Sequence, residues 1–114
     1  MHVFLEKGYI DSEELHILLE ERDVGKAEFV LVDVRESMEF NMGHIKGVDI
    51  LQPTSSFNQW AQALFNNTKD KTVIFTCRTG NRSGQIQNLF RQHGHHGALN
   101  HFGGIVTYRG TIEK

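Results

Sequence analysis

One stretch of the chain, residues 72–83, carries the residue types that nucleophilic chemistry needs. An apolar run over residues 72–76 ends at Cys77, the single cysteine of the chain. A polar loop with a glycine and two arginines follows, and apolar residues at helical spacing come after it. This order predicts a strand, a tight loop and a helix, and open α/β sheets bind ligands at the carboxyl ends of their strands. The sequence therefore places a thiol where a ligand would bind.

The loop after the thiol predicts an anion-binding cup. The thiolate is the reactive form of cysteine, and its pKa falls beside cationic side chains and at helix N-termini. Arg78 and Arg82 supply the cations, and we expect a helix to begin near Arg82 or Ser83, where free N–H groups favour an anion. Gly80 permits backbone angles that other residues resist, and Asn81 tolerates a left-handed conformation. Successive N–H groups of such a loop form a concave site for negative charge.

A lone cysteine in a soluble domain is more often a small buried hydrophobe than a nucleophile. The position at the end of an apolar strand, with cationic residues immediately after it, favours a reactive thiol here. We therefore predict that Cys77 is the catalytic nucleophile. The predicted substrate-binding residues are those of the loop: Arg78, Thr79, Gly80, Asn81 and Arg82.

Three motifs, in the same order along the chain, resemble those of the rhodanese (thiosulfate sulfurtransferase) family. The loop CRTGNRS at residues 77–83 resembles the active-site loop of that family. The other two are DVRE at 33–36 followed by EF at 39–40 and GHIKG at 43–47, and GGI at 103–105 between Gly94 and Tyr108. The resemblance runs from about Ile10 to Tyr108. The chain departs from the family ending at His101, Phe102 and Tyr108, which affects the rim of the site and the preference for an acceptor.

The resemblance implies an α/β, rhodanese-like fold of three layers, in which helices cover both faces of a mostly parallel central sheet of about five strands. By its length of 114 residues the chain is expected to be one domain, residues 1–114. Asp11 and Glu14 form a capping-box pattern before apolar residues at helical spacing. The expected elements are a lead-in or edge strand over 1–9, helices over 11–24, 57–65 and 83–93, a helical turn over 37–42, strands over 29–32, 48–51, 72–76 and 98–100, and a short helix over 103–109.

The resemblance also implies a double displacement. The Cys77 thiolate would attack the sulfane sulfur of a small anionic donor such as thiosulfate, and sulfite would leave a persulfide on Cys77. A thiophilic acceptor, cyanide in the test tube or a thiol in the cell, or a sulfur-accepting protein, would then remove the sulfur. Backbone N–H groups from Arg78 to Arg82 would hold the terminal sulfur. No cofactor and no metal are expected.

Two other functions compete with turnover of thiosulfate. Cysteine phosphatases of related fold also use a Cys-loop-Arg site, but with a loop one residue longer than the four residues between Cys77 and Arg82. The smaller loop favours a single sulfur atom over a phosphoryl group. A persulfide carrier without turnover, or an interaction module, is the second alternative. Arg82 has two possible orientations, toward the substrate or braced against a structural partner, and the sequence leaves both open.

Several other polar residues have a structural and a chemical interpretation. Asp33 and Arg35 could be catalytic by position, but the resemblance favours an ion pair that braces the fold, with Glu36 and Glu39 as candidate partners. His44 could be a general base, but the family match places it in a structural turn. The histidines near the C-terminus could bind zinc only if several converge, and a metal site is not predicted for them: His93, His95, His96 and His101.

Composition narrows the class of partner and compartment. The net charge of −2 recommends no nucleic-acid partner. A single cysteine excludes an internal disulfide and suits a reducing compartment. No stretch approaches the ~20 apolar residues that span a membrane, and residues 1–8 have no signal-peptide pattern. The expected location is cytoplasmic, with no membrane partner.

Overall fold

The structure, a computed structural model, describes residues 2–114 and is built around one parallel sheet. The strand order is β1-β6-β5-β2-β4, and every neighbouring pair is parallel. These strands are β1 (Tyr9–Ile10), β2 (Val30–Asp33), β4 (Ile50–Leu51), β5 (Val73–Thr76) and β6 (Ala98–His101). The helices are α1 (His2–Lys7), α2 (Ser12–Asp23), α3 (Ser37–Met42), α4 (Phe57–Thr68) and α5 (Asn81–Gln92), with 3-10 turns η1 (Thr54–Ser56) and η2 (Ile105–Thr107).

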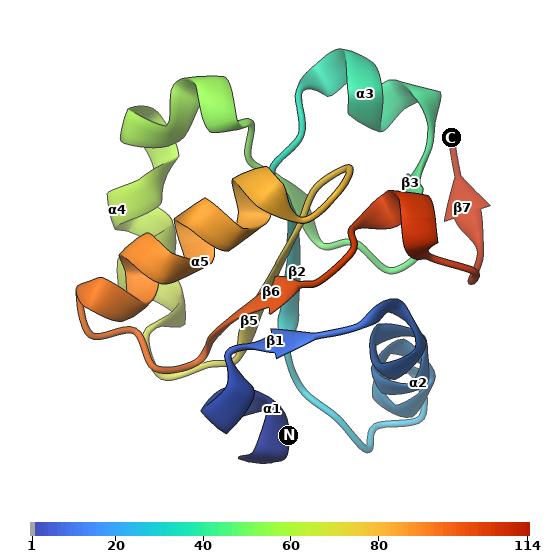
Figure 1. Cartoon of the computed structure of the whole chain (residues 1–114), viewed down its shortest axis with the longest axis horizontal. Coiled ribbons are helices and arrows are strands. Elements are labelled where there is room, and N and C mark those ends of the chain that lie inside the picture. Colours follow the sequence, from blue (N-terminus) through green and yellow to red (C-terminus); the bar gives the residue numbers. More distant parts are fainter. Residues whose placement is uncertain (1) are drawn as a thin grey trace.

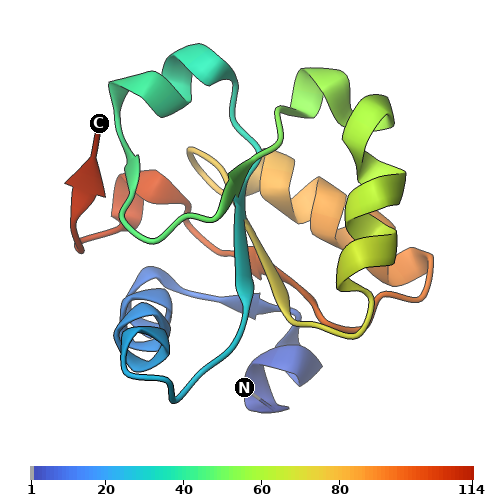
Figure 2. The ribbon, with the colours of Figure 1, turned by 180° about the vertical axis from the view of Figure 1, so that it is seen from behind.

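Helices cover both faces of the sheet, which confirms the predicted α/β fold. Helices α4 and α5 lie together on one face and α2 lies on the other (Figures 1 and 2). Side chains of β5 alternate between the two cores, because successive residues of a strand point to opposite faces. Val73 and Phe75 pack with α4 and α5, whereas Ile74 packs with the leucines of α2. The central strands are therefore apolar on both sides, as buried parallel strands require.

The capping box that the sequence predicts is present at the start of α2. The Glu14 N–H donates to Asp11 Oδ1 at 2.8 Å, and the Asp11 N–H donates to Glu14 Oε1 at 2.9 Å. Two donors that the helix leaves free are satisfied in this way. Leu15, Leu18 and Leu19 are buried under the sheet, so the periodic stripe is confirmed as core.

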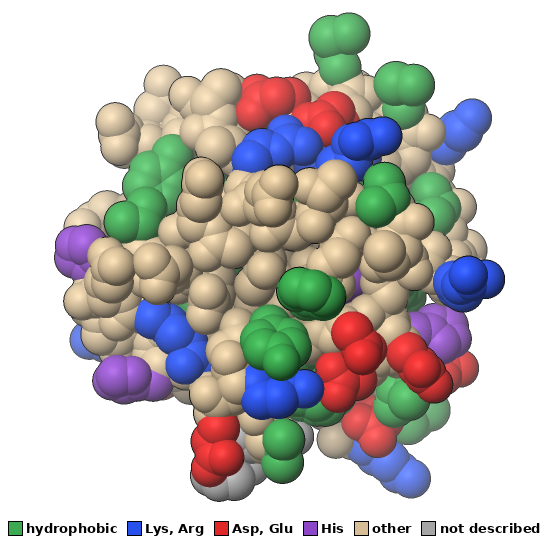
Figure 3. All heavy atoms as spheres, in the orientation of Figure 1, with side chains coloured by type: hydrophobic (Ala, Val, Ile, Leu, Met, Phe, Trp, Pro, Cys, Tyr) green, Lys and Arg blue, Asp and Glu red, His purple; other side chains and the backbone are tan. Residues whose placement is uncertain are grey.

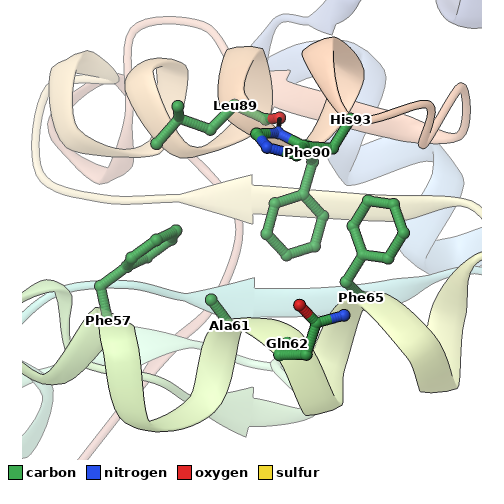
Figure 4. Close-up of a pocket in the computed structure, with 7 residues that line it drawn as sticks. All are labelled: Phe57, Ala61, Gln62, Phe65, Leu89, Phe90 and His93. Carbon is green, nitrogen blue, oxygen red and sulfur yellow. Dashed lines mark hydrogen bonds between the residues drawn. The ribbon is translucent and has the colours of Figure 1, made fainter.

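A groove of about 380 Å³ lies between α4 and α5, away from the Cys77 loop (Figure 4). Rings from both helices point into it, and Leu89 and His93 flank its α5 side. The apolar stripe of α4 was predicted as core packing, which is confirmed: Trp60 and Leu64 are buried, and Phe57, Ala61 and Phe65 pack partly buried against the same core.

Both chain ends differ from the expectation. Residues 2–7 form helix α1 where a lead-in or edge strand was expected, and only Tyr9 and Ile10 form an edge strand; Met1 lies outside the described residues. Within 48–51, only Ile50 and Leu51 form a strand. A second, antiparallel sheet joins β3 (His44–Ile45) to β7 (Ile112–Glu113). Strands of two residues, such as β3 and β7, are too short to show an alternating pattern, so the pairing of these two was not predicted from the sequence.

Asp33 and Arg35 form a buried brace at the carboxyl end of β2. Arg35 Nη2 lies 3.0 Å from Asp33 Oδ2, and its Nε donates to both carboxylate oxygens. The guanidinium also donates to the carbonyls of Gly43 and Glu39, at 2.6 and 3.3 Å. The expected ion pair is present, but the carboxylates proposed as its partners lie elsewhere: Glu39 binds Arg82, and Glu36 binds Ser55. Arg35 thereby ties β2 to the turn after α3.

Removing the cation of this brace should strongly destabilise the fold. Asp33 is fully buried, and Arg35→Ala leaves its carboxylate without a counter-ion. We expect the free energy of unfolding in urea to fall by about 3–5 kcal/mol. The exposed Arg109→Ala is the matched control and should change it by less than about 0.5 kcal/mol. A loss below about 1 kcal/mol for Arg35→Ala would show that the pair does not brace the fold.

Candidate active site

Cys77 lies between the end of β5 and the start of α5, at the carboxyl edge of the sheet (Figure 1). Helix α5 begins at Asn81, one residue before the earlier of the two predicted starts. Gly80 caps it with a φ of 94°, a left-handed conformation that favours glycine. The thiol side chain is buried, at 1% exposure. The structure therefore brings the strand end, the loop and the helix N-terminus together around one sulfur atom.

Hydrogen-bond donors surround the sulfur. The Gly80 N–H donates to Cys77 Sγ at 3.1 Å, and Ser83 Oγ lies 3.4 Å from the same atom. Burial raises the pKa of the Cys77 thiol, but the Ser83 hydroxyl and the N–H groups of Ser83, Gly80 and Thr79 outweigh burial, so the pKa is lowered. This arrangement favours an anionic sulfur, because hydrogen bonds to the charged form stabilise it.

The two arginines of the loop play different parts. Arg82 donates to both carboxylate oxygens of Glu39, at 2.7 and 2.9 Å, and this bond lowers the pKa of Glu39 to about 2 against the cost of burial. The guanidinium of Arg82 is therefore held by a structural partner. The predicted role of Arg82 in substrate binding now rests on its backbone N–H and stays a prediction. Arg78 is exposed. The largest causes that lower the pKa of Cys77 are hydrogen bonds and not these cations, contrary to the expected weighting.

Opposite charges are neighbours elsewhere on this face of the molecule. Figure 3 shows Lys and Arg side chains directly beside Asp and Glu side chains, in the orientation of Figure 1.

None of the helices in residues 2–114 has the length and the apolar composition that a membrane span requires.

The segment around Gly103 and Gly104 packs against the Cys77 loop and hydrogen-bonds to its backbone. The Ile105 N–H donates to the Cys77 carbonyl at 2.9 Å, and the Val106 N–H donates to the Arg78 carbonyl at 3.1 Å. A side chain at Gly104 would collide with the Arg78 carbonyl, so the backbones can approach only with glycine there. The GGI motif at residues 103–105 therefore packs directly against the CRTGNRS loop at residues 77–83.

Asn100 and Ser83 belong to the site, although the sequence singled out neither as a functional residue. Asn100 lies one residue before the end of β6, beside β5, and its Nδ2 donates to the Gly80 carbonyl at 3.2 Å. Ser83 Oγ donates to Asn100 Oδ1 at 2.6 Å. The available signal was a polar residue at the carboxyl end of a buried strand, which is where such sheets place their sites.

The histidines near the C-terminus lie in different surroundings. No group of three or more His, Cys, Asp or Glu side chains in residues 2–114 is arranged to hold a metal ion. His93 and His96 are exposed, and His95 is buried against Phe65 and Phe90. His44 stacks on Phe40, and its Nδ1 lies 3.0 Å from the Phe40 carbonyl. It begins the short strand β3, whereas the resemblance implied a turn.

His101 is a buried polar side chain that hydrogen-bonds to Thr76, the residue before Cys77, and to Ser12. Its Nδ1 lies 2.7 Å from Thr76 Oγ1 and its Nε2 lies 2.7 Å from Ser12 Oγ. Ser12 continues the chain of bonds to Thr107 Oγ1 at 2.7 Å. Burial lowers the pKa of His101 to about 4. A neutral imidazole therefore joins β5, β6, α2 and η2.

This burial predicts a stability that depends on pH. The folded pKa is depressed below 6.5, so the unfolded chain binds a proton that the folded chain does not, and stability falls as pH drops from 6.5 toward about 4. His101 should account for about 2 kcal/mol of the loss between about pH 7 and pH 4.5. His101→Leu should flatten that slope in urea unfolding, whereas the exposed His96→Leu should keep it. Equal slopes in His101→Leu and the unsubstituted protein would contradict the assignment.

Comparison with known proteins places the chain among rhodanese-like domains. The family profile described as "Rhodanese-like domain" matches residues 12–111. The chain is 33% identical over 102 residues to the rhodanese-like/PpiC domain-containing protein 12 of Arabidopsis thaliana, which covers 87% of this chain and 33% of the relative. It is 31% identical over 81 residues to the probable adenylyltransferase/sulfurtransferase MoeZ of Mycobacterium tuberculosis, covering 71% of this chain and 20% of that protein. The chain thus spans a third or less of these two relatives.

A solved structure of similar size matches more evenly. The human single-domain sulfurtransferase TSTD1 superimposes with a TM-score of 0.70 at 26% identity, covering 87% of this chain and 92% of that one. The fold is shared along most of both chains.

Proposed function

The chain belongs to the family of rhodanese-like domains, and we propose that it moves a sulfane sulfur from thiosulfate or a related anionic donor to a thiophilic acceptor through a persulfide of Cys77. The observation that carries the proposal is the set of donors around the buried sulfur, above all the Gly80 N–H at 3.1 Å and the Ser83 hydroxyl. Family relatives and neighbours named as sulfurtransferases support it. We also propose that residues 1–114 act as one domain, because β1 lies in the same sheet as β5.

The first half-reaction begins with attack by the thiolate. A bond forms between Cys77 Sγ and the outer sulfur of thiosulfate, the S–S bond of the donor breaks, and sulfite leaves with the bonding electron pair. The negative charge then lies on the terminal sulfur of the persulfide. N–H groups of the loop at Thr79, Gly80 and Arg82 are proposed to hold that sulfur, since donors that are already oriented stabilise charge without reorganising. No cofactor takes part in the proposed reaction.

The second half-reaction returns the enzyme. A thiolate or cyanide attacks the terminal sulfur, and Sγ leaves with the electron pair that it shared. The proposed acceptors are a thiol, cyanide in the test tube, or a sulfur-accepting protein. A cytoplasmic location stays a prediction.

The geometry of Arg82 weighs against the phosphatase alternative. A phosphoryl group carries charge on several oxygens, and a cation within the cup would have to neutralise it. The guanidinium of Arg82 is instead bonded at both ends to Glu39. Four residues separate Cys77 from Arg82, which leaves a cup suited to a single sulfur atom. The persulfide carrier differs from the enzyme only in turnover, so the two are separated by kinetics.

The direct test is the intact mass of the protein after thiosulfate. We expect a gain of one sulfur atom that is lost on adding cyanide or a thiol, and repeated cycles when donor and acceptor are both present. Cys77→Ser removes the chain's one thiol and should show neither the gain nor turnover. A sulfur gain that survives Cys77→Ser would refute the mechanism, and a single gain without turnover would identify a carrier.

Arg78 is the exposed cation beside the site and is proposed to recognise anionic donors. Arg78→Ala should lower kcat/KM for thiosulfate by about tenfold, the size of a solvent-screened charge contact. The loss for an uncharged sulfane donor should be smaller. The exposed Arg109→Ala is the control for a change of net charge. Equal losses with both donors would argue against recognition of the anion by Arg78.

A further inference from the structure

The Ser83 hydroxyl has one proton and two acceptors. Its Oγ lies 2.6 Å from Asn100 Oδ1 and 3.4 Å from Cys77 Sγ. A hydroxyl carries a single donor hydrogen, so it can donate fully to only one of them at a time. The bond to Asn100 is at the short end for O–H···O, and an uncharged thiol sulfur is a weak acceptor, so the hydroxyl favours Asn100 when the sulfur is uncharged.

The orientation of Asn100 follows from its second bond. Its Nδ2 donates to the Gly80 carbonyl at 3.2 Å, and only the NH₂ end of an amide can donate to a carbonyl. Oδ1 is therefore the end that faces Ser83, and it must accept. The Gly80 carbonyl also accepts the Gly84 N–H at 3.0 Å, so the loop is not held by Asn100 alone.

We propose that Asn100 is a positioning residue for sulfur transfer that acts through Ser83: it is the resting acceptor of the Ser83 hydroxyl, which turns to Cys77 Sγ whenever Sγ is negatively charged. The inference rests on the proposed function, in which Cys77 is the nucleophile. In the described structure, the side-chain hydrogen bonds of Asn100 join it to Ser83 and to the Gly80 carbonyl, and none reaches the sulfur of Cys77.

During the reaction, the Ser83 hydroxyl would donate in turn to Cys77 Sγ and to Asn100, depending on which atom carries the negative charge. In the free thiolate the charge is on Sγ, and Ser83 donates to it. When the bond from Sγ to the outer sulfur forms and sulfite leaves with its electron pair, the charge moves to the terminal sulfur, and the hydroxyl returns to Asn100. When the acceptor takes the terminal sulfur, Sγ leaves with the electron pair and Ser83 donates to it again. No proton is transferred between residues in this cycle, because the Ser83 hydroxyl only changes its orientation.

Asn100 therefore competes with the sulfur for one hydrogen bond. Removing its Oδ1 takes away the hydrogen bond that Ser83 makes while Cys77 is a thiol, whereas the thiolate keeps its bond from Ser83, so the balance shifts toward the thiolate. A hydrogen bond between neutral groups is worth about 1 kcal/mol, so the thiol pKa should fall by about 0.7 unit without Asn100. Removing the Ser83 hydroxyl should have the opposite sign and raise it by about one unit.

Other charges near the thiol stay constant in this comparison. Arg82 of α5 is paired with Glu39 of α3, and its charge interacts with Cys77 and Glu36. Arg78 is exposed in the loop, and His101 of β6 bonds to Thr76 and Ser12. The bonds that the structure shows for the Ser83 side chain join it to Cys77 and Asn100.

The test is the Cys77 pKa, read from the ultraviolet absorbance of the thiolate against pH, with Cys77→Ser as the blank. Asn100→Leu keeps the branched shape and the number of heavy atoms of the side chain and removes both polar ends. We expect the pKa to fall by about 0.7 unit in Asn100→Leu, to rise by about one unit in Ser83→Ala, and to be equal in Ser83→Ala and the double variant. Gln87→Ala is the matched control, because Gln87 also ties α5 to β6, through the Ala98 carbonyl, without touching Ser83. It should leave the pKa unchanged.

Three results would overturn the proposal. They are an unchanged or raised pKa in Asn100→Leu, a fall of the same size when Ser83 is already Ala, and a fall of the same size in Gln87→Ala. If Asn100→Leu does not fold, Asn100→Ala supplies the same comparison, and Ser83→Ala must still raise the pKa. The measurement uses no sulfur donor, so a protein that forms no persulfide refutes the proposed function and leaves this result to be judged separately.

Discussion

The hydrogen-bond donors gathered around the buried sulfur of Cys77 are the constraint on which the rest of the site depends. An anion that is shielded from water is costly unless hydrogen bonds replace the lost hydration. Here the replacements are the Ser83 hydroxyl and N–H groups of the loop and of the first turn of α5. Those donors converge only if Gly80 is left-handed and if the loop lies directly on Gly103 and Gly104. The glycines of two separate motifs are thus consequences of one electrostatic requirement.

Two arginines near this sulfur are each paired with a carboxylate, whereas Arg78 is exposed. Arg35 is neutralised by Asp33, and Arg82 by Glu39, so each guanidinium fixes a piece of backbone or a helix. Arg82 joins the first turn of α5 to α3, and Arg35 joins β2 to the turn after α3. The causes that lower the pKa of Cys77 are therefore hydrogen bonds from oriented groups, since these guanidinium charges are already paired.

The sequence predicted the fold and the place of the site better than the contacts within it. The capping box at Asp11, the apolar run that became β5 and the loop before α5 each have a strong local signal, and all three are present. The partner of Arg82 was left open, since Glu39 is far away along the chain and only folding brings the two together. Asn100 was missed for the same reason, because its role arises from its place in a strand beside β5. The pairing of β3 with β7 joins two segments that are too short for any periodic pattern.

The most direct test of this account is the pKa of Cys77 in the unsubstituted protein, from the thiolate absorbance over pH with Cys77→Ser as the blank. The single cysteine makes the assignment unambiguous. If the hydrogen bonds of the loop outweigh burial, the midpoint will lie below about 8.5, the value of a free cysteine. A midpoint at or above that value would mean that burial prevails, that the loop does not stabilise the thiolate, and that Cys77 is a packed side chain and not a nucleophile.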